Sequence, residues 1–225
     1  MTEILSVSEI LARAESVLVD FDGPICSIFS GLPAPEVARR LRDAYDEAHS
    51  GASRLAQSDD PLEVVRVAAL EGLPNVGELE ALLTDLEVTA VDQSAPTPNA
   101  QVAIEALHAD GHLLAVVSNN STAALKRYFA NHGLDRYASP LVGREAIRLS
   151  KMKPAPDMLW LALEAHGVAP REAVLIGDSV TDVQAAQAAG VMSIGYANKS
   201  GKAERLHRAG ATAVIDDMAD LIRRG

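Results

Sequence analysis

The chain has 225 residues, of which 48% are apolar, so it is long enough and apolar enough to bury a substantial core. Its formal net charge of −11 argues against nucleic acid or an anionic membrane as a partner. A single cysteine, Cys26, excludes an internal disulfide and fits a reducing, cytoplasmic location.

The N-terminal residues carry acids and lack a basic segment followed by a long apolar core, so we do not expect a signal peptide there. We expect no membrane helix either, because no apolar run approaches the roughly 18 residues that one needs. The first predicted element is a short amphipathic helix in SVSEILARAE (6–15). A buried strand follows at 16–20, where SVLVD is almost continuously apolar.

From about Cys26 to Ala95 the sequence has helical periodicity and no convincing strand. The stretches 33–51, 59–72 and 75–93 predict three or four amphipathic helices, and the turn-rich SAPTPNA (94–100) closes the segment. This is too much chain for a loop. We therefore expect an all-helical insertion, a cap domain over residues 26–95.

The remainder of the chain alternates between strands and helices. Apolar runs predict strands at 113–118, 140–143, 173–178, 192–197 and 212–216, and the helical stretches at 98–111, 121–133, 156–167, 181–190 and 201–210 all end in glycine. Such alternation is typical of a parallel sheet with helices on both faces. The predicted fold is α/β, a Rossmann-like doubly wound parallel sheet formed by residues 1–25 and 96–225, with the helical cap inserted.

Polar side chains stand where the predicted strands end. They are Asp20 and Asp22, Ser118 and Asn119, Asp178 and Asp182, with Lys153 in a loop before the fourth strand. In an open parallel sheet, ligands bind beyond these carboxyl ends. Clustered carboxylates favour a hard cation such as Mg²⁺, while a lysine, a hydroxyl and free N–H groups bind phosphate. We therefore predict a site for a phosphoryl group and Mg²⁺.

Four motifs carry a family resemblance. DFDG (20–23), VVSNNS (116–121), KMKPAP (151–156) and IGDSVTD (176–182) resemble, in order and spacing, the four motifs of the haloacid dehalogenase-like (HAD-like) hydrolases. The resemblance covers nearly the whole chain. With its predicted cap, the chain looks like the α-helical-cap subgroup that includes phosphoglycolate phosphatases and β-phosphoglucomutases.

The resemblance implies a role for each residue. Asp20 is expected to be the nucleophile and Asp22 the general acid and base. Phosphoryl oxygens are expected to bind the Ser118 hydroxyl, the Asn119 backbone N–H and Lys153. The resemblance implies a Mg²⁺ site made of Asp20, the backbone carbonyl of Asp22 and Asp178. Asp182 is expected to orient this site from behind these ligands or through water.

Asp22 also narrows the reaction. Dehalogenases and phosphonatases of the family lack this second acid, whereas phosphatases and phosphomutases keep it. We therefore expect a Mg²⁺-dependent phosphatase acting on a small phosphorylated metabolite, as a monomer or weak homodimer. A phosphomutase and a non-catalytic binding protein remain alternatives.

Several assignments stay open at this stage. Lys151 is a rival to Lys153 for the phosphate, and Arg54 is a weak candidate for a cap residue that reaches the substrate. Ser121 is a better N-cap for its helix than Ser118. Cys26 is expected to be a small buried apolar residue. Pro24 stands where the family usually has threonine, which leaves the orientation of Asp22 unsettled.

Overall fold

A computed structural model describes residues 5–48, 55–145 and 149–222 of the chain. Its centre is a six-stranded sheet in which every neighbouring pair is parallel. In spatial order the strands are β5 (Leu141–Arg144), β4 (Leu113–Ser121), β1 (Ser16–Val19), β6 (Ala173–Gly177), β7 (Met192–Tyr196) and β8 (Ala213–Ile215). The α/β fold predicted from the sequence is confirmed.

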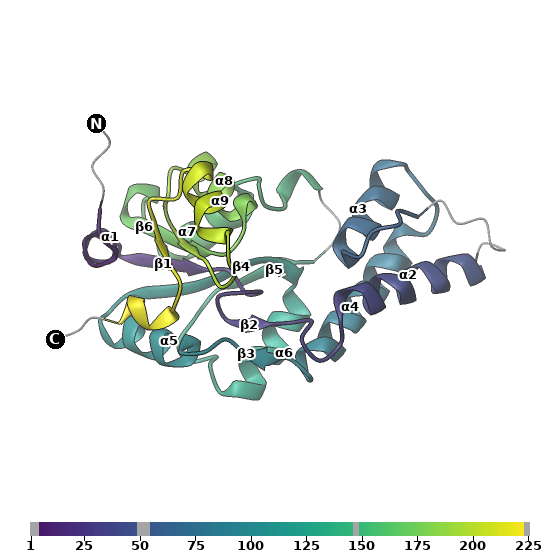
Figure 1. Cartoon of the computed structure of the whole chain (residues 1–225), viewed down its shortest axis with the longest axis horizontal. Helices are drawn as coiled ribbons and strands as arrows, with labels where there is room; N and C mark the ends of the chain where they lie inside the picture. Colours follow the sequence, from purple (N-terminus) through teal and green to yellow (C-terminus); the bar gives the residue numbers. More distant parts are fainter. Residues whose placement is uncertain (1–4, 49–54, 146–148, 223–225) are drawn as a thin grey trace.

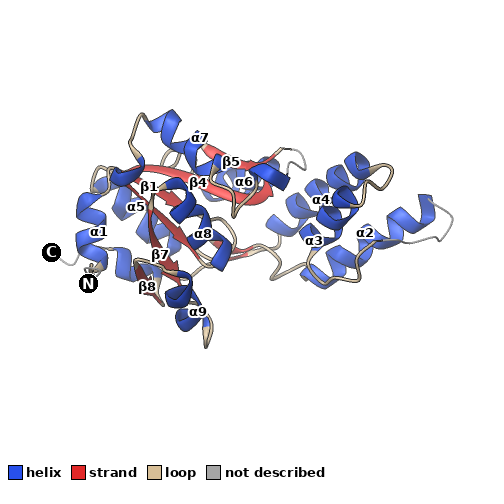
Figure 2. Cartoon of the chain, turned by 90° about the horizontal axis from the view of Figure 1, so that it is seen from above, coloured by secondary structure: helices blue, strands red, loops and turns tan. Residues whose placement is uncertain are grey.

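Helices cover both faces of this sheet (Figure 2). Against one face pack α1 (Val7–Arg13), α5 (Ala100–Ala109) and α6 (Thr122–His132); against the other pack α7 (Asp157–His166) and α8 (Val180–Ala189). Neighbouring residues of β1 divide between the two cores, with Val17 and Val19 in one and Leu18 in the other. A strand covered on both faces needs apolar residues at every position, which explains its continuous apolar run.

The remaining elements of this part lie near the last strands. Helix α9 (Lys202–Ala209) packs through Leu206, and three short 3₁₀ helices cover Leu149–Lys151, Pro170–Glu172 and Met218–Leu221. As predicted, α6 to α9 each end at a glycine, and Ser121 caps α6 by accepting a hydrogen bond from the Ala124 N–H. Among the described residues, no helix is long and apolar enough to cross a membrane.

Three helices lie to one side of the sheet (Figure 1). They are α2 (Ala34–Ala48), α3 (Pro61–Leu70) and α4 (Val76–Val91), which pack on one another; α4 also packs on α6. We call α2 to α4 the helical segment. The chain enters and leaves it through β2 (Cys26–Ser27) and β3 (Ala95–Pro96), which pair antiparallel. The expectation of no strand between 26 and 95 is therefore wrong, because two-residue strands are too short to produce a pattern.

The order of the strands fixes where a ligand site can form. From β1 the chain moves outward to β4 and β5, then returns and builds β6, β7 and β8 on the other side. The connections thus diverge around β1, and the crevice beyond its carboxyl end is the place where open α/β sheets bind ligands.

Candidate active site

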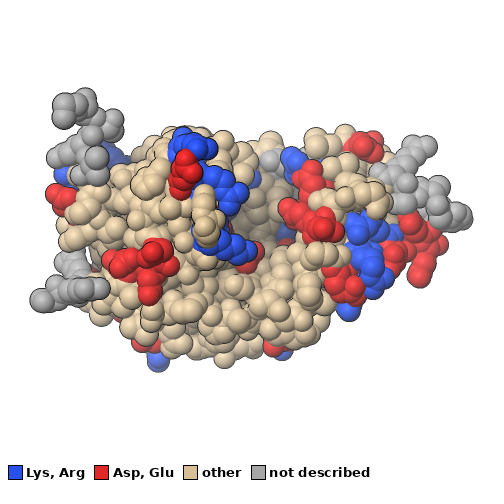
Figure 3. Space-filling view, viewed as in Figure 1, with Lys and Arg blue, Asp and Glu red and all other residues tan. Residues whose placement is uncertain are grey.

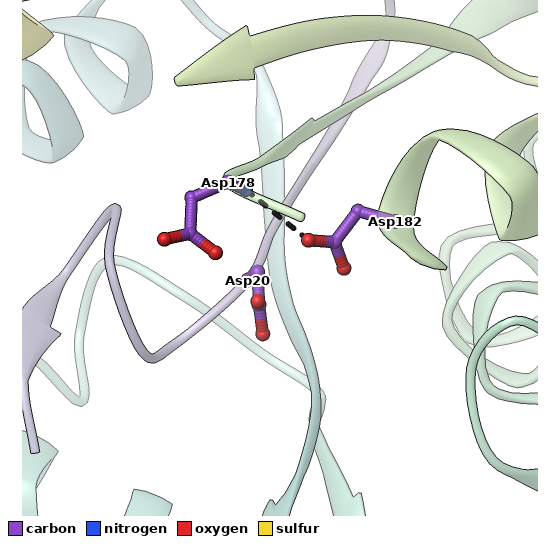
Figure 4. A group of neighbouring side chains, drawn as sticks. All are labelled: Asp20, Asp178 and Asp182. Carbon is purple, nitrogen blue, oxygen red and sulfur yellow. Dashed lines mark hydrogen bonds between the residues drawn. The ribbon is translucent and has the colours of Figure 1, made fainter. Parts of the chain in front are cut away.

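Three aspartates converge beyond the ends of β1 and β6 (Figure 4). Asp20 directly follows β1, Asp178 directly follows β6, and Asp182 lies in the first turn of α8. One carboxylate oxygen from each lies within 4.8 Å of the others. The topology produces this cluster, because parallel strands deliver their carboxyl ends to the same edge.

Asp20 is 7% exposed and has two protein donors on the same oxygen. Its Oδ1 accepts a hydrogen bond from the Phe21 N–H at 2.7 Å and lies 2.8 Å from the Lys153 Nζ. Burial, followed by the charges of Asp182 and Asp178, raises the pKa of Asp20 to about 7, although Lys153 opposes the shift. Without an added cation, the site therefore carries an excess of negative charge.

Lys153 ties this cluster together. Its buried Nζ donates to Asp182 Oδ1 at 2.5 Å and to the Val117 carbonyl at 2.9 Å, besides its contact with Asp20. Burial alone would lower the pKa of Lys153, but the charges of Asp182 and Asp20 outweigh it and raise that pKa. Lys153 is thus a fixed ammonium group. Its rival Lys151 is exposed.

Asp182 is almost fully occupied by the protein. Its Oδ2 accepts hydrogen bonds from the N–H groups of Asp178 and Ser179 at 3.1 and 3.0 Å and from the Ser179 hydroxyl at 2.6 Å. The same residues form the capping box of α8. These donors and Lys153 lower the pKa of Asp182 despite its burial. It is a permanent anion that holds the Asp178 backbone and Lys153 in place.

Asp178 has a cationic partner that the sequence did not reveal. The Nζ of Lys202, at the start of α9, donates to Asp178 Oδ2 and to Asn198 Oδ1. Burial raises the pKa of Asp178, and Lys202 opposes that shift. The sequence does not point to Lys202, because this residue comes from a different helix and no motif connects it to the acids.

Asp22 lies in the loop after β1 and outside the three-aspartate cluster. Its Oδ1 accepts a hydrogen bond from the Ile28 N–H at 3.1 Å. Burial raises the pKa of Asp22 to about 6, which this hydrogen bond partly offsets. The carboxyl group is therefore poised to gain or lose a proton near neutral pH.

The turn that carries Asp22 is tightly bonded. Gly23 has φ +104° and donates its N–H to the Cys26 carbonyl at 2.7 Å. The Gly23 carbonyl accepts from the hydroxyl of Thr97 at 2.5 Å, and the Ile25 N–H donates to Phe21 at 3.2 Å. These bonds use no group of Pro24. Cys26 is fully buried, as predicted.

Two of the predicted phosphate-binding residues, Ser118 and Asn119, lie in a bulge of β4. Val117 pairs with Val142 and Ser121 pairs with Arg144, so four residues of β4 span the length of two on β5. Within the bulge, the Ser118 hydroxyl accepts from the Asn120 N–H at 3.3 Å.

Asn119 joins this bulge to the lysine loop through its amide side chain. Its Nδ2 donates to the Lys153 carbonyl at 3.0 Å, and its Oδ1 accepts from the Lys153 N–H at 2.9 Å. The sequence assigned only the backbone of Asn119 to the site. Arg54, the candidate for a cap residue that reaches the substrate, lies outside the described residues.

The acid cluster fits a hard divalent cation. The protein donors to Asp20 both reach Oδ1, and Lys202 reaches Oδ2 of Asp178, so within the described residues Asp20 and Asp178 each keep an oxygen for a ligand. Carboxylate oxygens are the ligands that Mg²⁺ prefers. The raised pKa of Asp20 indicates that added positive charge is favourable at this point.

Comparison with known proteins gives consistent results. The family model described as haloacid dehalogenase-like hydrolase matches residues 29–196. A phosphoglycolate phosphatase of Rhodospirillum rubrum is 30% identical over 223 residues, covering 92% of this chain and 89% of the relative. Phosphoglycolate phosphatases of Haemophilus influenzae and Cupriavidus necator are 31% and 35% identical, with 56% and 55% of this chain aligned. The chain spans about half the length of these two relatives, 55% and 53%.

Solved structures share the fold at lower identity. CbbY from Rhodobacter sphaeroides, in complex with phosphate, has a TM-score of 0.68 at 20% identity and covers 92% of this chain and 96% of its own. A β-phosphoglucomutase-like protein from Thermotoga maritima has a TM-score of 0.64 at 22% identity, with the same coverage. At this identity, the likeness shows a common architecture.

Proposed function

The chain belongs to the haloacid dehalogenase-like hydrolase family, and we propose that it is a Mg²⁺-dependent phosphatase that hydrolyses a phosphate monoester of a small metabolite. One observation carries the proposal. A buried lysine bridges Asp20 and Asp182 beside Asp178, beyond the carboxyl ends of the central strands. A nucleophile, a fixed cation and free carboxylate oxygens then surround one point. Phosphoryl transfer needs this positioning and charge neutralisation.

In the first proposed half-reaction, a carboxylate oxygen of Asp20 attacks phosphorus and the ester P–O bond breaks. Asp22 gives its proton to the departing oxygen. In the second, Asp22 takes a proton from water as that water attacks the aspartyl-phosphate, which returns Asp20 and releases phosphate. A pKa of about 6 lets Asp22 serve both steps near neutral pH.

The other proposed roles concern charge and orientation. The Ser118 hydroxyl, the Asn119 N–H and Lys153 are proposed to bind the phosphoryl oxygens. Asp20, the Asp22 carbonyl and Asp178 are proposed to hold Mg²⁺, which supplies positive charge for the transferring group. Asp182 is proposed to orient this site through the Asp178 backbone and Lys153, which it already contacts.

We propose a small, anionic substrate. Figure 3 shows a hollow between the sheet-bearing part and the helical segment, with Lys and Arg side chains along the former. Residues 26–95 are proposed to act as a cap over this hollow, which excludes large substrates. Relatives named phosphoglycolate phosphatase make 2-phosphoglycolate the first compound to test. A cytoplasmic monomer or weak homodimer remains our expectation.

The test is turnover of p-nitrophenyl phosphate and a panel of phosphate esters, with Mg²⁺ and with EDTA. We expect metal-dependent release of phosphate that Asp20→Asn abolishes. Turnover that survives both EDTA and this substitution contradicts the mechanism. Phosphate transfer to a second sugar phosphate, without net release, identifies a mutase instead.

A further inference from the structure

Arg144 ends β5 and is the largest side chain that the described residues bury completely. Its guanidinium donates to both oxygens of Glu87, at 3.1 and 3.0 Å, and to Glu80 Oε1 at 3.0 Å. A fourth bond reaches the backbone carbonyl of Asn119 at 2.6 Å. One buried cation thus holds two acids of the helical segment and the bulge beside the active site.

Glu87 makes the complementary contacts from α4. Its Oε2 accepts a hydrogen bond from the Ser121 N–H at 2.8 Å, and its Oε1 accepts from the Asn120 Nδ2 at 3.2 Å. Glu87 is 1% exposed. Together, Arg144 and Glu87 contact three successive residues, from Asn119 to Ser121. These contacts hold the bulge in addition to the bonds that Asn119 makes to Lys153.

The backbone of β5 is fitted to the same bulge. A Cβ atom built on Gly143 would lie 2.6 Å from the Thr122 nitrogen and 2.8 Å from the Asn120 carbonyl oxygen, closer than Cβ atoms approach other atoms in proteins. A glycine beside Arg144 lets β5 approach the bulge directly. The side-chain network and the backbone contact therefore fix the same few residues.

The network has an energetic cost that a purely structural role does not need. Removing an arginine and a glutamate from water is costly, and an apolar pair of similar volume is often at least as stable. What an apolar pair cannot supply is a donor for the Asn119 carbonyl and an acceptor for the Ser121 N–H. The chemistry of the pair thus matches the backbone groups of the bulge.

We propose that Arg144 and Glu87 are a positioning pair for phosphoryl binding. They hold the Asn119–Ser121 backbone so that the Ser118 hydroxyl and the Asn119 N–H face the transferring phosphoryl group. Since Glu80 and Glu87 belong to α4, the geometry of the phosphate site is set in part from the helical segment. This inference rests on the proposed function.

A second ion pair provides a matched control. Arg127 of α6 binds both oxygens of Asp92, at the end of α4, at 2.7 and 3.0 Å. It joins the same two parts of the molecule, and it too binds both oxygens of a carboxylate. However, it is exposed and its partners do not include the bulge. Arg127→Met therefore removes a comparable bridge without touching the phosphate site.

The experiment compares Mg²⁺-saturated Arg144→Met, Glu87→Met, the double variant and Arg127→Met. It measures the inhibition constant of inorganic phosphate, KM, kcat and the melting temperature. We expect Arg144→Met to weaken phosphate binding about tenfold, the equivalent of about 1.4 kcal/mol, while Arg127→Met changes it less than about twofold. The double variant should regain much of the melting temperature but none of the phosphate affinity.

Arg144→Lys and Glu87→Gln extend the test if the apolar single variants do not fold. Lysine keeps the charge but cannot bind the Asn119 carbonyl and Glu87 with one planar group, so phosphate affinity should stay low. Hydrogen exchange of the Ser121 amide gives a readout without turnover, and we expect faster exchange in both variants than in Arg127→Met.

Four outcomes separate the possibilities. Phosphate affinity that recovers with stability in the double variant overturns the positioning role, as does an Arg144→Met inhibition constant equal to that of Arg127→Met. A wild-type protein with neither turnover nor phosphate binding contradicts the proposed function instead. Unchanged exchange of the Ser121 amide in Glu87→Gln overturns the inference without reference to activity.

Discussion

The backbone of Gly23 lies so close to the side chain of Asp178 that residue 23 has no room for a side chain. A Cβ atom on Gly23 would lie 2.9 Å from the Cβ of Asp178 and closer still to its carboxyl group. The loop that carries the proposed general acid therefore fits against a proposed metal ligand through a residue without a side chain.

Gly23→Ala should damage the site beyond its effect on the backbone. Alanine at φ +104° costs about 1–2 kcal/mol, and it also displaces Asp178. We expect a loss of Mg²⁺ affinity and a kcat/KM at least tenfold lower, by analogy with the loss of other charge-stabilising groups. Gly133→Ala, at φ +65° with open space around it, is the control. Equal effects of the two substitutions on Mg²⁺ affinity would contradict the prediction.

The stability of the metal-free protein should fall as pH rises through the titration of the site. The folded-state pKa values of Asp20 and Asp22 are raised to about 7 and about 6, from an ordinary value of 3.8. Their protonated forms thus favour folding below about pH 4, and that contribution disappears as pH rises toward 7. Melting temperatures in EDTA should show Asp20→Asn gaining on the wild type from pH 5 to 8.

Mg²⁺ should reverse this trend, because it takes the place of the protons. We expect the increase in the wild-type melting temperature on adding Mg²⁺ to be larger at pH 8 than at pH 5.5. Asp20→Asn is the control, since it lacks the carboxylate that proton and metal share. A Mg²⁺ effect that does not depend on pH in the wild type would contradict the proposed metal site.

Lys202→Met should strengthen Mg²⁺ binding. The ammonium group of Lys202 contacts Asp178 and repels a second cation at the same carboxylate. We expect a severalfold lower Kd for Mg²⁺ by calorimetry. Arg205 lines the same pocket as Lys202 and Asp178, so Arg205→Met removes a nearby charge and provides the control. Weaker Mg²⁺ binding by Lys202→Met than by Arg205→Met would show that Lys202 supports the metal site instead.

Pro24→Thr should leave the fold and the turnover nearly unchanged. The turn is closed by bonds from Gly23, Ile25 and Thr97, and Asp22 is held by the Ile28 N–H, so none of these contacts needs residue 24. We expect a similar melting temperature and a turnover number within about twofold, since residue 24 supplies none of these bonds. A severalfold rise in turnover would indicate that Pro24 tunes the site away from hydrolysis.

The sequence predicted the strands and the residues at their ends because two simple rules govern them. Buried parallel strands need continuous apolar residues, and their carboxyl ends meet at one edge. Asp20, Asp178 and Asp182 therefore lie together in the structure. Of the two candidate lysines, the proline after Lys153 favours it in the sequence, and its buried contacts separate it from Lys151 in the structure. The catalytic roles of these residues stay predictions.

The sequence does not reveal partners that lie far apart along the chain. Arg144 and Glu87 look like ordinary charged residues of a strand and a helix, and only tertiary packing makes them partners. Lys202 reaches Asp178 from a later helix for the same reason. The β2–β3 pair failed to appear because two residues carry no periodicity. Local patterns report local structure, whereas these contacts depend on the assembled fold.

The position of β1 between β4 and β6 also determines when the site can form during synthesis. Asp20, the proposed nucleophile, is translated early, but its neighbour Asp178 follows a strand made more than 150 residues later. At about 5–20 residues per second, this delay is roughly 8–30 s. Until then β1 has an unpaired edge, which is a hazard for aggregation. A ribosome-bound chain that stops before β6 thus carries Asp20 but no cluster of acids. The proposed active site is therefore complete only after β6, the strand that completes the centre of the sheet, has been synthesised.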